Sequence, residues 1–426
     1  MISASPTTSH PSEPTADPPS SLASHVAEPG NTLAHVAWAH FRGDRLAMAG
    51  LFSVILLFLV AILSPFLANN KPYYLVSVKK TEEAPPTAGS GAEVPRTIVL
   101  EKQHTFPLLH SLTREDLRWL LYPVLAVMIW AMRRRQSAKE LLLLAILGVG
   151  LAETLVSQHR NISDMRDYRA LVNSTTGSAY AWMPPIPFNP LEQEGDILLP
   201  PSWTNWMGTD HLGRDITSRL VHASRISLTV GFVATSISIG LGLLVGSLAG
   251  FYRGWTDIVL SRVIEIMECF PTMFLILAVL AFLQPSLFNI MLVIGFTSWT
   301  GVARLVRGEF LRLSEQPFAM AASALGASDR RIILLHILPN AMGPILVSAT
   351  FGVASSILME SGLSFLGMGV QPPTPTWGDM LAQARDGVVS TWWLAVFPGI
   401  MIFITITAYN LVGQGIRDAM DPRLRE

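Results

Sequence analysis

The chain has 426 residues, of which 50% are hydrophobic and only 14% are charged, and its mean hydropathy is +0.41. Soluble domains carry about a quarter charged residues, so this composition argues against a water-soluble enzyme. The formal net charge of −1 leaves no cationic excess for a nucleic-acid partner, and the single cysteine, Cys269, excludes an intrachain disulfide and a cysteine-based zinc site. The apolar residues fall in long runs, which indicates a polytopic membrane protein.

The N-terminal region predicts a tail followed by a membrane anchor. The first 41 residues contain no lysine or arginine and are rich in Ser, Pro, Thr and Ala, so we expect a disordered cytoplasmic tail over residues 1–38. Residues 39–70 hold the first transmembrane helix, whose apolar run is too long for a signal peptide. An insert over residues 71–200 follows, with external segments that include a flexible stretch at 82–95.

Six apolar runs are long enough to cross about 30 Å of hydrocarbon as helices. They lie at residues 46–68, 226–252, 257–283, 288–306, 337–359 and 392–412. Two shorter runs within residues 119–156 are separated by a basic turn and predict an inserted transmembrane hairpin, with a re-entrant or interfacial pair as the alternative. The expected count is therefore eight spans, or six without the hairpin.

Short basic loops set the predicted orientation, because moving Arg and Lys across the bilayer is costly. Placing these loops inside puts both termini in the cytoplasm for eight spans and for six. The segments 69–118 and 157–225 also carry basic residues, but long segments translocate largely regardless of charge. We expect a multi-pass protein of the inner membrane.

The sequence predicts no energy source within this chain. None of the five lysines follows a glycine, so no G-x-x-x-x-G-K-[ST] phosphate-binding loop can be written. Metalloprotease, nucleophile-elbow and Cys/His metal motifs are missing from the sequence as well. We expect no enzyme activity and no cofactor in this chain, so an ATP-driven process would need hydrolysis in another subunit.

An ion gradient is the alternative energy source, and it would need acids within the membrane. Glu265 and Glu268 lie three residues apart on one helix face and could supply them. The favoured interpretation places both near the inner interface, where Arg262 neutralises one of them. Glu360, near the outer end of its span, is interpreted as a helix-end or gating contact.

Four glycines recur along the predicted span at 226–252. Their spacing suits the close approach of another helix, although a pore lining would have a similar composition. These residues are Gly240, Gly242, Gly246 and Gly250.

The loop after the fourth core span carries the strongest local signal. A short helix over residues 319–325 ends at Gly326, which permits a left-handed turn, and the side-chain oxygens of Ser328 and Asp329 can cap a second helix. That helix is predicted to end at Pro339, which removes a backbone donor and resets the chain direction. The spacing fits a helix-turn-helix bracket across the cytoplasmic face, and it fits an ordinary well-capped loop equally well.

This loop resembles the coupling loop of permease subunits of binding-protein-dependent ABC importers, in the dipeptide/oligopeptide/nickel branch. The family loop reads E-A-A, three residues, Gly and then I/H-x-L-P, and the chain departs from it at Met320, which replaces the glutamate. The resemblance implies that the loop over residues 307–339 inserts into a groove on the ATP-hydrolysing subunit. The implied coupling residues are Ala321, Ala322, Gly326, Ser328, Asp329, Arg330, Arg331 and Pro339.

Three further stretches resemble the same family: a G-T-D-x-x-G-R-D motif, the external loop after the fifth core span, and the C-terminal segment. The matching residues are Gly208, Thr209, Asp210, Gly213, Arg214, Asp215, Glu360, Gly362, Gly367, Gly369, Pro372, Trp377, Gly378 and Asn410. The likeness covers residues 40–70 and 200–426, and the insert over 71–200 is atypical of the family.

The resemblance implies an all-α membrane protein with an ABC importer permease (MetI-like) core of six transmembrane helices, to which the hairpin at 119–156 would add two. Residues 201–426 would form the permease core with five of those six helices. The implied partners are a homologous permease in a heterodimer, two ATP-binding subunits that hold ATP and Mg, an external solute-binding protein and the lipid membrane. The implied function is ATP-driven import of di- or oligopeptides, with nickel or another small solute as the alternative cargo. An ion-gradient transporter and a membrane scaffold are the alternatives outside this family.

Overall fold

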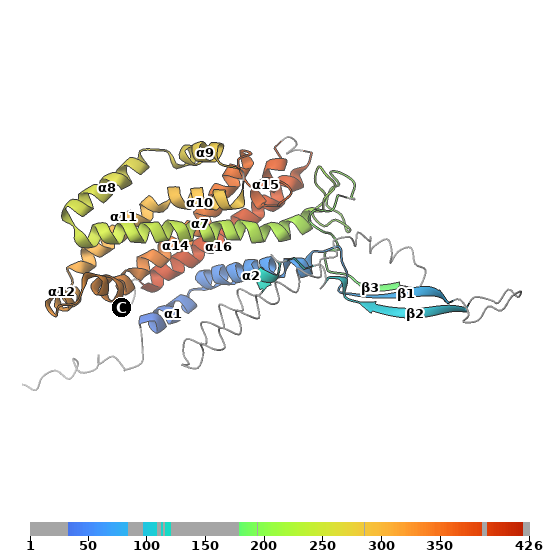
Figure 1. Cartoon of the computed structure of the whole chain (residues 1–426), viewed down its shortest axis with the longest axis horizontal. Helices are drawn as coiled ribbons and strands as arrows, with labels where there is room; N and C mark the ends of the chain where they lie inside the picture. The colour runs from blue at the N-terminus through green and yellow to red at the C-terminus, as the bar shows by residue number, and fades with distance from the viewer. Residues whose placement is uncertain are drawn as a thin grey trace, which may run out of the picture.

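A computed structural model of the protein describes residues 33–83, 97–108, 112–113, 116–120, 179–193, 195–284, 286–385 and 390–420. The long helices lie side by side along the long axis of the molecule, and a small sheet lies at one end (Figure 1). Most of the predicted hairpin, residues 121–156, and the tail up to residue 32 lie outside the described residues. The eight-span prediction is therefore not confirmed.

Two helices open the described chain, α1 (Leu33–Gly43) and α2 (Arg45–Leu67). The disordered tail predicted up to residue 38 is therefore wrong for residues 33–38, which belong to α1. The ring of Phe41 is buried against α16 (Trp392–Met420), and such tertiary packing stabilises a helix that is too short to persist alone.

Five helical segments in the described part of the chain are long and apolar enough to cross a membrane. They are Arg45–Leu67, Ile216–Tyr252, Leu287–Ser314, Asp329–Phe365 and Trp392–Met420. A bent pair, α8 (Gly254–Glu268) and α9 (Thr272–Phe282), would make a sixth if it counts as one span. Its two halves meet at 81°, so the continuous span predicted at 257–283 is wrong. Pro271 explains the break, because it lacks an N–H and disfavours helical backbone at the preceding residue.

The central helix α7 (Ile216–Tyr252) packs against α11 (Trp299–Ser314) through three of the four glycines. A Cβ atom would lie 2.6 Å from the Val302 side chain if added to Gly242, 2.5 Å from the Ala303 carbonyl oxygen if added to Gly246, and 2.7 Å from the Arg307 carbonyl oxygen if added to Gly250. Close packing is thus confirmed at these positions, whereas Gly240 faces open space.

The remaining elements of the core are α10 (Leu287–Thr297), α12 (Pro317–Ala324), α13 (Asp329–Arg331), α14 (Leu338–Phe365) and α15 (Trp377–Gln383). Helix α12 lies at the end of the bundle opposite the sheet (Figure 1). This arrangement separates the predicted coupling residues from the predicted external motifs by the length of the molecule.

The insert contains a three-stranded antiparallel sheet in the order β2-β1-β3, so the all-α prediction is wrong there. Strand β1 (Tyr74–Glu83) pairs with β2 (Thr97–Thr105) and, along its first residues, with the short strand β3 (Ala179–Trp182). Residues 76–79 of β1 alternate apolar and polar side chains, which is typical of a strand. β1 was not predicted because it is too short and too charged to form a long apolar run.

Candidate functional site

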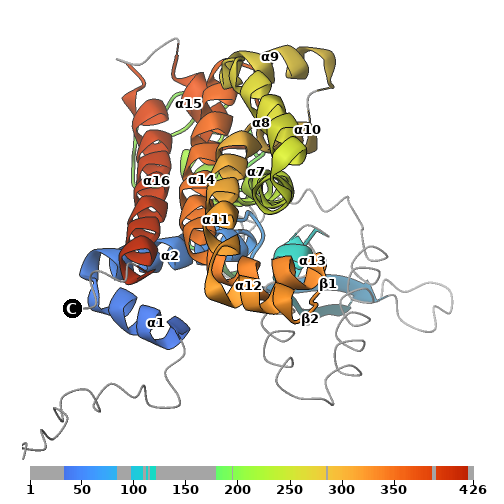
Figure 2. The same ribbon diagram turned by 90° about the vertical axis from the view of Figure 1, so that its left-hand side faces the viewer.

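The predicted bracket lies where α11 continues into α12 and α13, at one end of the molecule (Figure 2). Gly326 has a φ of +78°, and its amide donates to the Ser323 carbonyl at 2.9 Å. The amide of Ala327 donates to the Ala322 carbonyl at 3.1 Å, which closes the C-terminal turn of α12. The predicted left-handed turn is confirmed.

The second half of the bracket differs from the prediction in two respects. Ser328 precedes α13 without a side-chain cap, and its backbone carbonyl instead accepts from the amides of Arg331 and Ile332. Pro339 does not end the helix, because α13 continues through a π-helical turn, η1 (Ile332–Ile337), into α14. Pro339 lies two residues after this π-helical turn, inside the continuous helix Asp329–Phe365.

The bracket has one buried face and one exposed face. Ala319, Ala322 and Ile332 are buried in one apolar cluster with Phe310 of α11. Leu325, at the tip, is 88% exposed. The predicted coupling residues other than Ala322 are also exposed, namely Ala321, Gly326, Ser328, Asp329, Arg330, Arg331 and Pro339. The buried face of the bracket therefore packs against α11, and its exposed face presents an apolar tip beside basic side chains.

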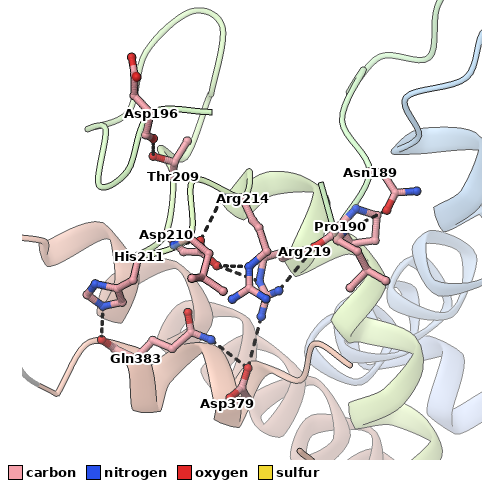
Figure 3. A network of polar contacts seen from close by, with 12 residues as sticks. Asn189, Pro190, Asp196, Thr209, Asp210, His211, Arg214, Arg219, Asp379 and Gln383 are labelled. Carbon is pink, nitrogen blue, oxygen red and sulfur yellow. Dashed lines mark hydrogen bonds and ion pairs between the residues drawn. The ribbon is translucent and has the colours of Figure 1, made fainter. Parts of the chain in front are cut away.

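At the opposite end of the molecule, two buried arginines bridge two aspartates (Figure 3). The Nε atom of Arg214 donates to Asp210 at 2.7 Å, and Nε of Arg219 lies 3.5 Å from the same carboxylate. Arg219 also reaches Asp379 of α15 at 3.3 Å. Burial raises the pKa of Asp379 above its ordinary value, and the charge of Arg219 opposes that rise. This network joins the G-T-D-x-x-G-R-D motif to α15.

The last aspartate of that motif starts α7. Asp215 accepts from the Ser218 amide at 2.7 Å and from the Asn205 side chain at 2.9 Å. Burial raises the pKa of Asp215, although these hydrogen bonds oppose the rise. Gly208 and Gly213 have φ values of +81° and +71°, a backbone region that favours glycine. The motif therefore acts as a rigid frame around the first turn of α7.

Two buried tryptophans tie the external loop to this frame. Nε1 of Trp377 donates to the Leu220 carbonyl at 3.2 Å, and Nε1 of Trp393 donates to the Thr209 carbonyl at 3.3 Å. A Cβ atom on Gly378 would lie 2.6 Å from the backbone of α14. The predicted external residues thus come from distant parts of the chain and meet at one end of the bundle.

Glu360 is fully buried near the end of α14 and accepts a hydrogen bond from Ser364 at 2.7 Å. This geometry agrees with the predicted helix-end contact. Gly367 follows α14 with a φ of +82°, and Gly369 packs directly on Ser364. Gly362 lies in α14 and Asn410 in α16, and Pro372 lies in the loop between α14 and α15.

The membrane acids are paired with arginines. Arg262 pairs with Glu265, which confirms the predicted neutralisation. Glu268 pairs with Arg304 of α11, a partner too distant in sequence to be predicted. These ion pairs give both carboxylates a structural partner and weaken the gradient-driven interpretation.

Arg225, which lies inside α7, was not among the predicted functional residues. Its Nε donates to the Ala61 carbonyl of α2 at 2.7 Å and its Nη2 to the Ile62 carbonyl at 3.2 Å, while Nη1 pairs with Asp116 of the insert. The signal that could have found it is Pro65, which has no N–H for the Ala61 carbonyl four residues earlier. The Ser64 hydroxyl donates to that oxygen at 3.1 Å, and Arg225 adds a charged donor from α7.

Comparison with known protein families finds two matches. Residues 242–426 match the family described as binding-protein-dependent transport system inner membrane component. Residues 32–86 match the N-terminal TM domain of oligopeptide transport permease C.

Curated relatives agree with these matches. The dipeptide transport system permease protein DppC of Alkalihalophilus pseudofirmus is 43% identical over 225 residues, which are 53% of this chain and 74% of that protein. The di/tripeptide transport system permease protein DppC of Pseudomonas aeruginosa is 41% identical and covers 56% of this chain and 81% of its own length. The glutathione transport system permease protein GsiD of Escherichia coli is 44% identical, with 53% and 74% covered.

Among solved structures, the MetNI methionine ABC transporter in inward-facing conformations has a TM-score of 0.38 and 18% identity, covering 46% of this chain and 96% of that one. An amino acid ABC transporter has a TM-score of 0.34 and 16% identity, with 49% and 94% covered. The relatives in sequence, each matched over about three quarters or more of its length, confirm the resemblance noted in the coupling loop. The chain belongs to the binding-protein-dependent transport system inner membrane components, as an ABC importer permease of the peptide branch.

Proposed function

We propose that this chain is one permease subunit of an ATP-driven importer of short peptides. The relatives are named for dipeptides, di- and tripeptides and glutathione, which share a peptide backbone with charged termini. In this proposal a homologous permease completes a heterodimer, and two ATP-binding subunits, which hold ATP and Mg, dock at the bracket. A solute-binding protein delivers cargo at the opposite end, and both termini of this chain lie in the cytoplasm.

The exposed tip of the bracket carries the proposal. Leu325 and Met320 are 88% and 56% exposed, which is unusual for large apolar side chains unless a partner covers them. Ala322 and Ile332, on the other face, are buried with Phe310 of α11. A push on the tip would therefore be transmitted to α11 and α14 together. The π-helical turn between α13 and α14 is a place where the helix can change its winding.

The domain organisation follows from the same proposal. Residues 1–32 would form a cytoplasmic tail, and residues 201–426, with the coupling loop at 307–339, would form the permease core. The insert at 71–200, with its hairpin at 119–156, would place external segments where the solute-binding protein or a neighbouring subunit can contact them. The sheet supports this placement, since it lies at the end of the molecule opposite the bracket (Figure 1).

Affinity purification from mild detergent tests the docking. The expected result is that two ATP-binding subunits and a second permease copurify with this chain. Leu325→Asp should abolish recovery of the ATP-binding subunits, because a charged side chain at the tip would have to be desolvated in the groove. Leu212→Asp is the matched control, since Leu212 is an exposed leucine at the other end of the molecule. Equal recovery from both variants would contradict the proposed docking site.

Uptake into proteoliposomes tests the cargo. The purified complex should accumulate radiolabelled alanyl-alanine when ATP is supplied, and glutathione is the second probe. Uptake of nickel ions without peptide uptake would replace the proposed cargo. Accumulation by the isolated chain without nucleotide would instead support an ion-gradient transporter, and assembly without any uptake would support a scaffold.

A further inference from the structure

Helix α11 has the opposite polarity to a helix that faces lipid. Its apolar side chains point inward against α7 and α14, and these are Trp299, Val302, Val306, Phe310 and Leu313. Its exposed face is polar or small and recurs at helical spacing, from Ser298 just before the helix through Gly301, Arg304 and Gly308. A lipid-facing helix would expose the apolar set, so the outer face of α11 is built for a different environment.

The polar face of α11 lies at membrane depth. Arg253, at the end of α7, donates to the Leu311 carbonyl and to the Ser314 hydroxyl. The ends of α7 and α11 therefore lie at the same level, and we take this level as the end of both spans on the side of the bracket. At 1.5 Å per residue, Arg304 lies about 15 Å further along the helix and Ser298 about 24 Å, within roughly 30 Å of hydrocarbon. The exposed residues therefore fall where lipid would otherwise lie.

An ion pair occupies this face. Arg304 pairs with Glu268 of α8, and the two side chains are 60% and 32% exposed. Charged groups at membrane depth face a wet cavity or another protein surface, because hydrocarbon solvates them poorly. Lipid is thus excluded as the neighbour of this pair.

A hollow continues from the same face. It has a volume of about 290 Å³ and is bounded by α7, α10, α11 and α14. Eight of its thirteen lining residues are Ser, Thr or Gly, including Thr235, Ser238, Ser348, Gly352, Ser355 and Ser356, and the other five are apolar. Ser298 and Gly301 belong both to this wall and to the exposed face of α11. The hollow and the face therefore form one continuous surface, rich in small and hydroxyl-bearing residues.

We infer that the outer face of α11, with the adjoining hollow and the Glu268–Arg304 pair, is this chain's wall of the peptide path. The inference rests on the proposed function and identifies the surface that the cargo passes. Hydroxyl groups and one neutral ion pair offer hydrogen bonds to peptide amides and charged termini. This wall faces a water-filled path, and the homologous permease forms the opposite wall of that path.

Thiol accessibility in the assembled complex tests the inference. Cys269→Ser removes the single cysteine, so introduced cysteines can be read individually. Gly301→Cys and Ser355→Cys probe the wall, whereas Phe403→Cys on α16 and Phe52→Cys on α2 probe exposed apolar surface. Because only the thiolate reacts and ionisation needs water, a charged methanethiosulfonate should modify the wall positions about tenfold faster than the controls. Modification at Gly301→Cys should also reduce alanyl-alanine uptake about tenfold, since the adduct occupies the path.

Each result decides between interpretations. Equal labelling rates at wall and control positions would overturn the inference, as would modification of Gly301→Cys without loss of uptake. A disulfide formed by an added oxidant between Gly301→Cys and a cysteine introduced into the partner permease, without methanethiosulfonate labelling, would show a dry subunit interface and would also overturn it. Alanyl-alanine uptake by the Cys269→Ser complex is measured first. If this complex takes up the dipeptide but Gly301→Cys and Ser355→Cys are not labelled, only the assignment of the wall is refuted. If the unmodified complex takes up no peptide, the proposed function itself is refuted.

Discussion

The Nε atom of Arg225 on α7 donates a hydrogen bond to the carbonyl oxygen of Ala61 on α2 at 2.7 Å. Pro65 cannot offer that oxygen an amide, so the guanidinium takes the place of the helix's own donor. Asp116 balances the charge, and the ring of Trp119 lies 5.9 Å from the guanidinium carbon. One arginine thus joins α2, α7 and the insert.

Replacing Arg225 with Met should lower the free energy of unfolding by about 3 kcal/mol. The Asp116 carboxylate loses its cation and keeps only its hydrogen bonds from Thr113, and the Ala61 carbonyl loses its charged donor and keeps only the Ser64 hydroxyl. Pro65→Ala supplies an amide for that carbonyl, so in this background the loss should be smaller by about 1 kcal/mol. Thermal denaturation of the purified complex in detergent measures both effects. If the loss of unfolding free energy in the double variant equals the sum of the losses in the two single variants, this account of Arg225 is refuted.

Asp210 should be the most sensitive residue of the external network. Asp210→Ala removes the acceptor for the amides of Leu212 and Arg214 and for the Arg214 side chain, and should cost about 3–5 kcal/mol. His211→Ala is the neighbouring control, since it removes one exposed hydrogen bond to Gln383 and should cost about 1 kcal/mol or less. The same denaturation measurement applies, and similar losses from both would show that the network does not stabilise the outer end.

The glycines of α7 should respond in opposite directions to alanine. Gly246→Ala places a Cβ 2.5 Å from the Ala303 carbonyl oxygen and should destabilise the protein by about 1–3 kcal/mol. Gly240→Ala meets nothing within 4 Å and should stabilise the helix by up to about 1 kcal/mol, because alanine is the better helix former. Melting temperatures of the two variants that shift in the same direction would contradict the packing described for α7 and α11.

Gly326→Val should separate ATP hydrolysis from uptake. Its φ of +78° disfavours a β-branched residue by about 1–3 kcal/mol, while a Cβ there meets no neighbour, so the effect is on backbone geometry alone. We expect hydrolysis to continue with fewer peptides imported per ATP. Gly254→Val introduces comparable strain outside the bracket, at a φ of +54°, and should keep the ratio unchanged. An unchanged number of peptides imported per ATP in Gly326→Val would show that the bracket does not need the left-handed turn at this residue.

Glu268→Gln or Arg304→Gln alone should lower the melting temperature of the complex more than the two together. Each single change leaves one unpaired charge at membrane depth, whereas the double change leaves a neutral, hydrogen-bonding pair. The exposed pair Arg262 and Glu265 is the control, since it should show a smaller difference between single and double variants. A double variant that is worse than either single one would mean that the charges do not compensate each other.

The core helices were largely predictable because lipid imposes both length and polarity on a spanning segment. The first span was predicted at residues 46–68 and is observed at Arg45–Leu67. Helix α7, by contrast, begins ten residues before the predicted 226. Arg219 and Arg225 made that stretch read as a loop, and their pairing with Asp379 and Asp116 is what allows them inside the helix.

Long-range contacts set the limit of sequence interpretation. Glu268 and Arg304 are far apart in the chain, and only the packing of α8 beside α11 brings them together. The π-helical turn at Ile332–Ile337 likewise has no signal that distinguishes it from ordinary helix, so Pro339 was read as a break. The local devices, such as the turn at Gly326 and the Asp215 motif, depend on adjacent residues and were visible in the sequence.

The amide of Asn69 donates to the Ile186 carbonyl at 3.1 Å, and the amide of Ile186 donates to the Leu67 carbonyl at 3.0 Å. The polypeptide thus departs from the tip of α2 and returns to the same spot. A cassette with coincident ends can be lengthened or exchanged at a single junction while the helices of the permease core keep their places, provided that a carboxylate still meets Arg225. This offers a route by which one transporter scaffold acquires an accessory module, and it marks residues 70–185 as the segment to transplant when engineering a related importer.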